Sequence, residues 1–203
     1  MQYLDAQTFL DSISARSGQD RRPDSATFEL TYGCNLRCVH CYNPTHRALP
    51  HELTTAEVCS ILTQMAELGV LTLSISGGEP SLRPDIEPIL RHARRAGLLI
   101  WMLTNATRMT PTFVSLLTEI PIAHMFVSIY GATVSTYESM TGVAGSFAHF
   151  LHGLDTLNAC PFPVTVRMPV TTINWTEVDA CQDLVESRGF KFQYSLDIHP
   201  RTD

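Results

Sequence analysis

The sequence predicts an α/β fold in which six parallel strands form a partial, TIM-like (β/α)6 barrel. Strand-like and helix-like segments alternate along the chain, and short βα alternation favours parallel strands joined by right-handed crossovers. Length sets the number of units, because an eight-unit barrel needs about 250 residues, or roughly 31 per unit. The 203 residues therefore hold about six units once roughly 25 N-terminal residues are set aside. A doubly wound sheet is the alternative.

Six apolar runs bounded by turn residues are the expected strands. They are Thr27–Tyr32, Leu71–Ser76, Leu98–Thr104, Ala123–Tyr130, Val164–Val170 and Phe190–Leu196. Every run but the last is followed by a segment with helical spacing. In either α/β architecture the loops after the strands form the functional face, so residues in these loops are candidates for one shared site.

Helix starts are marked by capping residues. Thr54 can cap a helix and Glu57, three residues later, completes a capping box, while Gly69 ends the same segment. A second such pair is expected at Asn174 and Glu177. Other helices are expected after Pro84, after Thr110-Pro111 and over Phe147–Leu157.

Residues 1–22 are expected to form a helical segment with apolar Leu4, Phe9, Leu10 and Ile13, and residues 23–203 a core domain. The N-terminus has early acids and no apolar core flanked by basic residues, so it does not resemble a signal peptide. The longest apolar stretches fall far short of the roughly 20 residues of a membrane helix. We therefore expect a cytoplasmic protein without membrane contact.

The composition narrows the function classes. The chain is 44% hydrophobic and 17% charged, which is typical of a globular protein. A net charge of −6 gives no electrostatic footprint for nucleic acid. Cytosolic thiols stay reduced, so the six cysteines indicate metal ligands or buried thiols rather than disulfides. Cys59, Cys160 and Cys181 are expected to be structural.

The other three cysteines, Cys34, Cys38 and Cys41, share the loop after the first expected strand. Thiols this close in sequence can converge on one metal centre without long loop closure. Structural zinc needs four ligands, and the fourth would have to be His40 or His46. An iron–sulfur cubane with three protein ligands fits best, and it leaves one iron free for an exogenous ligand. Zinc and three buried free thiols are the alternatives.

Taken with Gly77-Gly78-Glu79-Pro80 after the second strand, the Cys-x3-Cys-x2-Cys motif resembles the radical S-adenosylmethionine (SAM) superfamily from about residue 27 to residue 203. The resemblance implies a [4Fe–4S] cluster on the three cysteines and SAM on the open iron. It implies reductive cleavage of SAM to a 5′-deoxyadenosyl radical that abstracts hydrogen from a substrate. It also implies an electron donor such as flavodoxin or ferredoxin.

The resemblance assigns SAM-binding roles to further residues. Gly77, Gly78, Glu79 and Pro80 match the motif that receives the methionine ammonium. Glycines allow close backbone approach, and Glu79 or exposed carbonyls can accept from an ammonium. His40 stands at a position that is usually aromatic and packs near the adenine.

Three residues of later strands and strand ends complete the predicted SAM site. Asn105 lies in Thr-Asn-Ala, where the family often shows Thr-Asn-Gly, and a turn-stabilising asparagine is the alternative. Ser128 matches a polar position that commonly touches the ribose, and a buried, hydrogen-bonded serine is the alternative. Arg167 alternates with apolar residues and could pair with the SAM carboxylate. An outward-facing arginine fits the same pattern.

The segments Ser128–Gly131, Thr136–Glu138, Thr141–Gly142 and Gly145–Phe147 resemble the SPASM or twitch subgroup, whose cysteine-rich C-terminal extension binds auxiliary clusters. Many such enzymes modify ribosomal peptides or proteins, and others act in haem-related and quinone-cofactor pathways. A peptide or small-molecule substrate is therefore implied, with a peptide-modifying maturase as the prediction. No cysteine follows Cys181, so we expect the extension to be absent from this chain. The alternative of another class is a non-catalytic iron–sulfur sensor or scaffold, which would need no ammonium site.

Overall fold

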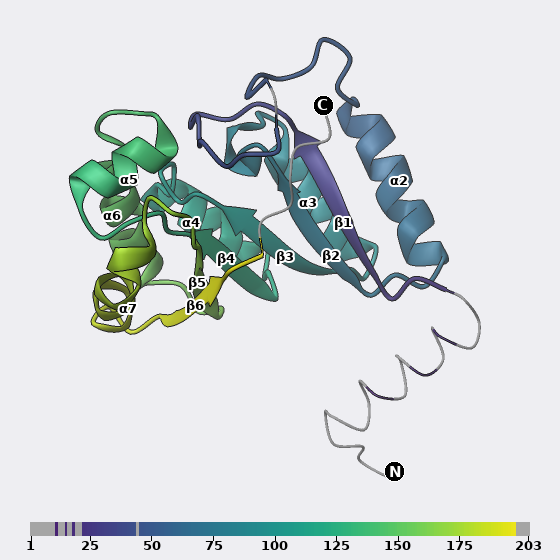
Figure 1. The fold of residues 1–203 in the computed structure, drawn as a ribbon. Helices are drawn as coiled ribbons and strands as arrows, with labels where there is room; N and C mark the ends of the chain where they lie inside the picture. The colour runs from purple at the N-terminus through teal and green to yellow at the C-terminus, as the bar shows by residue number, and fades with distance from the viewer. Residues whose placement is uncertain (1–10, 12–14, 16–17, 19–21, 44, 198–203) are drawn as a thin grey trace, which may run out of the picture.

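The computed structural model describes residues 11, 15, 18, 22–43 and 45–197. Its sheet contains β1 (Ser25–Thr31), β2 (Thr72–Gly77), β3 (Leu99–Thr104), β4 (His124–Ser128), β5 (Val164–Pro169) and β6 (Lys191–Ser195). All neighbouring strands are parallel and their order follows the sequence, so β1 and β6 are the two edges of an open sheet (Figure 1). The predicted partial barrel is confirmed. The doubly wound alternative is wrong, because it would reverse the strand order midway.

The helices of the described ranges connect successive strands. They are α2 (Thr55–Glu67), α3 (Ile86–Arg95), α4 (Pro111–Glu119), α5 (Val134–Thr141), α6 (Ser146–Leu157) and α7 (Val178–Glu186), with short 3-10 helices η1 (Pro80–Leu82) and η2 (Trp175–Glu177). Thr54 and Glu57 form the predicted capping box, and Thr110 caps α4. Helix α5 was not predicted as a separate element. Together with α6 it fills the connection between β4 and β5.

The second predicted capping pair is wrong, because Asn174 and Glu177 bond to other parts of the chain. Asn174 is fully buried, and its amide donates to the carbonyls of Tyr130 and Pro169, at the ends of β4 and β5. Glu177 accepts from the backbone N–H of Ala132 and from other donors at the start of α5. Long-range pairing of both side chains therefore overrides the local helix signal.

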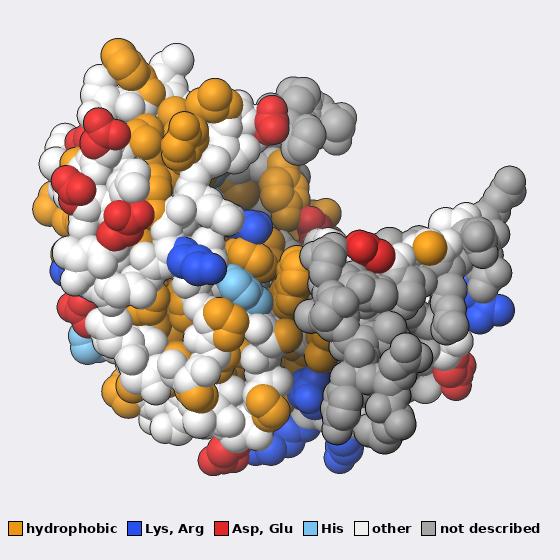
Figure 2. Space-filling model, turned by 90° about the horizontal axis from the view of Figure 1, so that it is seen from below, with side chains coloured by type: hydrophobic (Ala, Val, Ile, Leu, Met, Phe, Trp, Pro, Cys, Tyr) orange, Lys and Arg blue, Asp and Glu red, His pale blue; other side chains and the backbone are white. Residues whose placement is uncertain are grey.

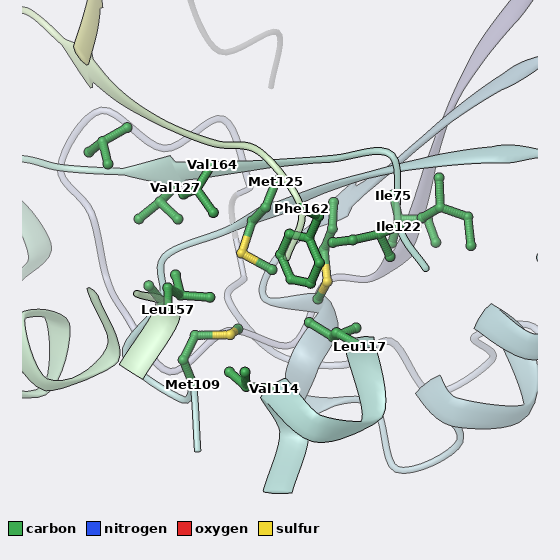
Figure 3. Packing of buried hydrophobic residues seen from close by; sticks show 14 of the residues in the cluster. Ile75, Met109, Val114, Leu117, Ile122, Met125, Val127, Leu157, Phe162 and Val164 are labelled. Carbon is green, nitrogen blue, oxygen red and sulfur yellow. The ribbon is translucent and has the colours of Figure 1, made fainter. Parts of the chain in front are cut away.

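One face of the sheet packs against the helices and forms the core. Alternate strand residues such as Ile75, Met125 and Val127 are fully buried there, against Leu117 of α4 and Leu157 of α6 (Figure 3). This period-two alternation is the pattern expected of a strand with one apolar face. The other strand positions face the inside of the partial barrel, and this surface is called the concave face below.

Two predictions depend on parts of the chain that the structure covers only partly. The apolar residues Leu4, Phe9, Leu10 and Ile13 of the predicted N-terminal helix lie outside the described residues. In the described ranges, none of the helices combines the length and the apolar character needed to cross a membrane.

Candidate active site

The three cysteines of the loop after β1 line one cavity of about 240 Å³ at the carboxyl ends of the strands. This cavity is called the cysteine cavity below. Its lining also includes Leu36, His40, Tyr42, His46, Ser76, Gly78, Leu103, Thr104, Asn105, Ser128 and Tyr130. The structure therefore brings together Cys34, Cys38 and Cys41 with four of the predicted SAM-site residues: His40, Gly78, Asn105 and Ser128.

The backbone of the cysteine loop is fixed on the end of α5. The Arg37 N–H donates to the Thr141 carbonyl at 2.8 Å, and the Val39 N–H donates to the Met140 carbonyl at 2.9 Å. At the start of the loop, the Cys34 N–H donates to the His46 carbonyl at 3.1 Å. Helix α5 is thus the support that presents the cysteines to the cavity.

The surroundings of the thiols are largely apolar. Burial raises the pKa of Cys34, and it raises the pKa of Cys38 to about 12. The Tyr130 hydroxyl hydrogen-bonds to the Cys38 sulfur, and burial raises the pKa of Tyr130 well above its usual value, so this group is a neutral donor. Neutral thiols must lose their protons on binding a metal, so loading of the site releases protons.

Two buried polar atoms beside the cysteine loop indicate that a further group belongs there. In the part of the chain that the structure describes, His40 Nδ1 and Tyr137 Oη are buried without a hydrogen-bond partner. The His40 ring lies 5.2 Å from the Tyr130 ring, which lies 5.6 Å from the Tyr137 ring. Buried polar atoms are rarely left unpaired, so a ligand with hydrogen-bonding atoms would suit this region.

The donor set fits a cubane. In the described ranges no three His, Cys, Asp or Glu side chains are grouped so as to hold a single metal ion. The three thiols instead border one cavity from separate points of a loop, as a cluster whose irons each take one thiolate requires. Three cysteine ligands with a fourth iron left open match the [4Fe–4S] cluster predicted from the sequence.

Gly77 and Gly78 let the loop after β2 approach the cysteine loop. The Gly78 N–H donates to the Thr31 carbonyl at 2.7 Å. A Cβ atom at Gly77 would collide with the Thr31 carbonyl, and one at Gly78 would collide with the carbonyls of Tyr32 and Gly33. Gly77 also has a φ of +120°, which only glycine adopts readily. The glycines are therefore required for packing between the loops, and Gly78 in addition borders the cavity.

Glu79 is a buried brace between the loops. It is fully buried and accepts from the Ser81 N–H and hydroxyl, from the Thr104 hydroxyl at 2.9 Å and from the Asn105 N–H at 2.8 Å. Burial raises the pKa of Glu79, and these donors oppose that shift. Pro80 is buried at the start of η1. Neither Glu79 nor Pro80 borders the cysteine cavity, so backbone carbonyls remain as the predicted acceptors of an ammonium.

Asn105 acts both in its turn and at the cavity. Its carbonyl oxygen accepts from Thr107, and its amide nitrogen donates to Asn35 and lies 3.9 Å from the Cys34 sulfur. The next residue, Ala106, has a positive φ of 58°, the conformation that favours the glycine often found there in the family.

Arg167 is the one predicted SAM-site residue of the later strands that does not border the cysteine cavity. Its guanidinium carbon lies 3.5 Å from the centre of the Phe126 ring on the concave face. It borders a second cavity of about 390 Å³, and Ser128 borders both cavities.

Sequence reasoning did not single out Ser76 and Tyr130 as lining residues, although both lie where it expected a site. Ser76 is in β2 directly before the Gly-Gly loop, and Tyr130 follows β4 two residues after Ser128. Placing every polar or aromatic residue at a strand end in the same site would have included them.

The structure is a half-open parallel barrel in which three cysteines line a cavity at the carboxyl ends of the strands, an arrangement that suits a cluster-dependent α/β protein. A family model described as the radical SAM superfamily matches residues 28–185. The chain belongs to the radical SAM superfamily, a family that uses a [4Fe–4S] cluster and SAM.

Similar proteins include enzymes of two kinds. The chain is 36% identical over 168 residues to the AdoMet-dependent heme synthase of Methanosarcina barkeri, covering 82% of this chain and 48% of that protein. It is 29% identical over 194 residues to the mycofactocin maturase MftC of Mycobacterium tuberculosis, covering 89% and 49%. The chain thus spans about half the length of these curated relatives.

The solved structure of Streptococcus suis SuiB bound to S-adenosylmethionine matches with a TM-score of 0.78 and 18% identity, covering 98% of this chain and 48% of that one. SuiB bound to its precursor peptide SuiA matches with a TM-score of 0.75 and 17% identity, covering 95% and 45%. At these identities the likeness concerns the fold.

Proposed function

We propose that this chain is the catalytic core of a radical SAM enzyme that modifies a ribosomally made peptide or protein. The observation that carries the proposal is the cysteine cavity, where Cys34, Cys38 and Cys41 meet Gly78 and Ser128 at the carboxyl ends of the strands. When bound, the cluster and SAM supply a 5′-deoxyadenosyl radical that removes a hydrogen atom from the substrate.

The residues of the cavity have separate roles in this proposal. The three thiolates hold the cluster, and backbone carbonyls near Gly78 receive the SAM ammonium. His40, which packs on Tyr130, lies beside the adenine, while Asn105 and Ser128 offer polar contacts. Leu36 and Leu103 exclude water from the reaction space, as radical chemistry requires.

The peptide substrate is supported by the names of similar proteins, one a mycofactocin maturase and one a SuiB structure bound to its precursor peptide. A second candidate substrate is a haem-related tetrapyrrole. It is favoured by the 36% identity to a heme synthase over 82% of this chain. In either case an electron donor such as flavodoxin or ferredoxin and a cytoplasmic location suit an enzyme with a reduced cluster.

The test is anaerobic reconstitution of the full chain, followed by incubation with SAM and dithionite and chromatography for 5′-deoxyadenosine. We expect release from the loaded protein and none from a Cys38→Ala control. A protein with full iron content that binds but never cleaves SAM would instead support the sensor or scaffold alternative. Adding a candidate precursor peptide or an iron coproporphyrin then separates the two substrate classes by which one stimulates release.

A further inference from the structure

The Arg167 side chain points away from the cysteine cavity. Its guanidinium lies over Phe126, which precedes Ser128 by two residues on β4 and is therefore farther from the carboxyl ends of the strands. The cysteine loop follows the carboxyl end of β1. The guanidinium therefore points toward the amino ends of the strands, away from the predicted cluster site. The cavity that Arg167 borders also includes Gln193 and Ser195 of β6.

A second cation, Lys191, shares this part of the concave face. Thr165 pairs in register with both Phe126 and Lys191, so Lys191 lies at the level of the ring that Arg167 covers. The positive charges of Arg167 and Lys191 add to burial in lowering the pKa of His124, whose ring stacks on Phe126 with centres 4.4 Å apart. The chain is acidic, with a net charge of −6, yet this stretch of the concave face is basic.

Neither cation has an acidic partner. In the described part of the chain, the ion pairs involve only Arg83, Arg91 and Arg188, so no described carboxylate lies within ion-pair distance of Arg167 or Lys191. Arg167 donates from Nε to the neutral Gln193 side chain at 3.1 Å. This bond orients the guanidinium and leaves its terminal nitrogens available. Arg167 and Lys191 are both exposed on the concave face, so an anionic ligand can reach them, and a carboxylate can accept from the terminal guanidinium nitrogens.

Aromatic side chains lie beneath and beside Arg167. Trp101 meets the Phe126 ring edge-on at 5.5 Å and is 38% exposed, which is unusual for so large an apolar residue. In Figure 2, hydrophobic side chains lie beside basic and histidine side chains at the hollowed middle of the molecule. Exposed aromatic surface next to unpaired cations suits a ligand with an apolar or planar body and an anionic group.

We propose that Arg167, which lies over Phe126 beside Trp101, and Lys191, at the same level of the sheet, form a subsite that binds a carboxylate of the substrate. The proposal rests on the proposed function, because it takes the cysteine cavity as the SAM site. Ser128 borders both cavities, so a substrate held by its carboxylate at Arg167 lies next to the place where the radical forms. Arg167 then orients the substrate rather than SAM.

The test compares an acid with its uncharged counterpart. Binding of 3-phenylpropionate and 3-phenylpropanamide to the reconstituted full chain is measured by anaerobic ligand-observed NMR. We expect the acid to bind about tenfold more tightly than the amide, the preference that a charge-assisted hydrogen bond provides. Arg167→Gln should remove the preference and Lys191→Gln should reduce it. Arg95→Gln, which alters an exposed arginine at the end of α3, is the control that retains it.

Two further arms identify the source of the carboxylate. A phenylalanine-ended peptide is compared as free acid and as amide, and iron coproporphyrin III is compared on wild type and Arg167→Gln. Binding that depends on Arg167 in either arm supports the subsite and names its occupant. Equal binding of acid and amide by the wild type overturns the proposal. The proposal is also overturned if the Arg167→Gln variant loses SAM affinity but keeps acid binding. That result would show that the Arg167 guanidinium contacts SAM and not the substrate.

Failure of the subsite and failure of the proposed function are separable. Acid binding is measured without SAM cleavage, and deoxyadenosine release is measured without the acid. A wild-type chain that cleaves SAM but does not distinguish acid from amide lacks the subsite and keeps the function. If the chain prefers the acid but never cleaves SAM, the proposed function is wrong and the proposed carboxylate subsite is supported.

Discussion

Two charged side chains of this barrel, Glu79 and Arg167, differ in their burial and in how many hydrogen bonds they make. Glu79 is fully buried, and its two oxygens accept four hydrogen bonds from backbone and hydroxyl donors. Arg167 is exposed, and its hydrogen bond to Gln193 uses one of its three nitrogens. The Glu79 carboxylate has its hydrogen-bonding capacity filled, whereas the Arg167 guanidinium has donors that remain available to a ligand.

The comparison separates framework from binding surface. A saturated buried charge holds its neighbours in one arrangement, so Glu79 fixes η1 and the end of β3 around the cysteine cavity. An exposed charge with unused donors can instead bind a ligand on the concave face. The cysteine cavity has features of both, because Glu79 holds its frame while Nδ1 of the lining residue His40 is unpaired within the described residues.

The largest expected effect is loss of the cluster on removal of a ligand thiol. Cys38→Ala should reduce the iron content after anaerobic reconstitution from about four irons per chain to background, because a three-ligand site has no spare thiolate. Cys59→Ala, which removes a cysteine of α2, is the matched control and should load normally. Full loading of the Cys38 variant would show that the cysteine cavity is not the cluster site.

The next effect concerns the frame that the two loops share. Gly78→Val should lose both iron and SAM binding, because the new side chain collides with the carbonyls of Tyr32 and Gly33 directly before Cys34. The Cys34 thiol would have to move with them. Gly97→Ala is a control at a helix end where a Cβ meets nothing, although its φ of 89° adds strain. A Gly78→Val protein with normal iron and weak SAM affinity would show that the glycine serves ligand approach alone.

Glu79→Gln should destabilise the fold by about 2–4 kcal/mol, because an amide nitrogen cannot accept from the donors that surround the buried carboxylate. The measurement is the free energy of unfolding of the cluster-free chain in urea. Glu87→Gln is the control, since Glu87 is half exposed and pairs with Arg91 at the surface, and a loss below about 0.5 kcal/mol is expected. If the two variants lose equal stability, Glu79 is not a brace.

The sequence allowed the barrel, its strand order and the cysteine cluster to be predicted, because these depend on local periodicity and spacing. The strand boundaries differ by one or two residues at most. Thr54 and Glu57 also behaved as predicted, since a capping box is made within one turn of helix. Asn174 and Glu177 show the same spacing but bond to β4, β5 and α5 instead. Nothing in a local pattern reveals such long-range partners.

The candidate site was predictable in its members but less so in their orientation. Periodicity put Arg167 on the face of β5 opposite Val164, Val166 and Met168 and left an outward-facing side chain open. It could not indicate that the guanidinium covers Phe126 instead of facing the cysteines. Likewise, the sequence identified Glu79 as polar and close to the ligand. Two of its four donors, Thr104 and Asn105 at the end of β3, meet it only in the fold, while Ser81 is a neighbour along the chain. Side-chain direction depends on tertiary neighbours, which spacing does not encode.

The smallest expected effect tests whether the basic stretch around Arg167 exists in solution. Burial, and after it the charges of Arg167 and Lys191, lower the pKa of His124 below its ordinary value of about 6.5. A histidine with a lowered pKa stays neutral in the folded chain while the unfolded chain takes up a proton. Its contribution to stability is therefore complete above pH 6.5 and is lost as the pH falls toward the folded pKa.

The His124 ring signal in NMR should titrate below pH 6.5 in the wild type, and Arg167→Gln should move that midpoint upward by a fraction of a unit. Arg95→Gln, far along the chain on α3, should not move it. A His124 midpoint at or above 6.5, or one that ignores Arg167, would mean that the two cations do not share the concave face with His124.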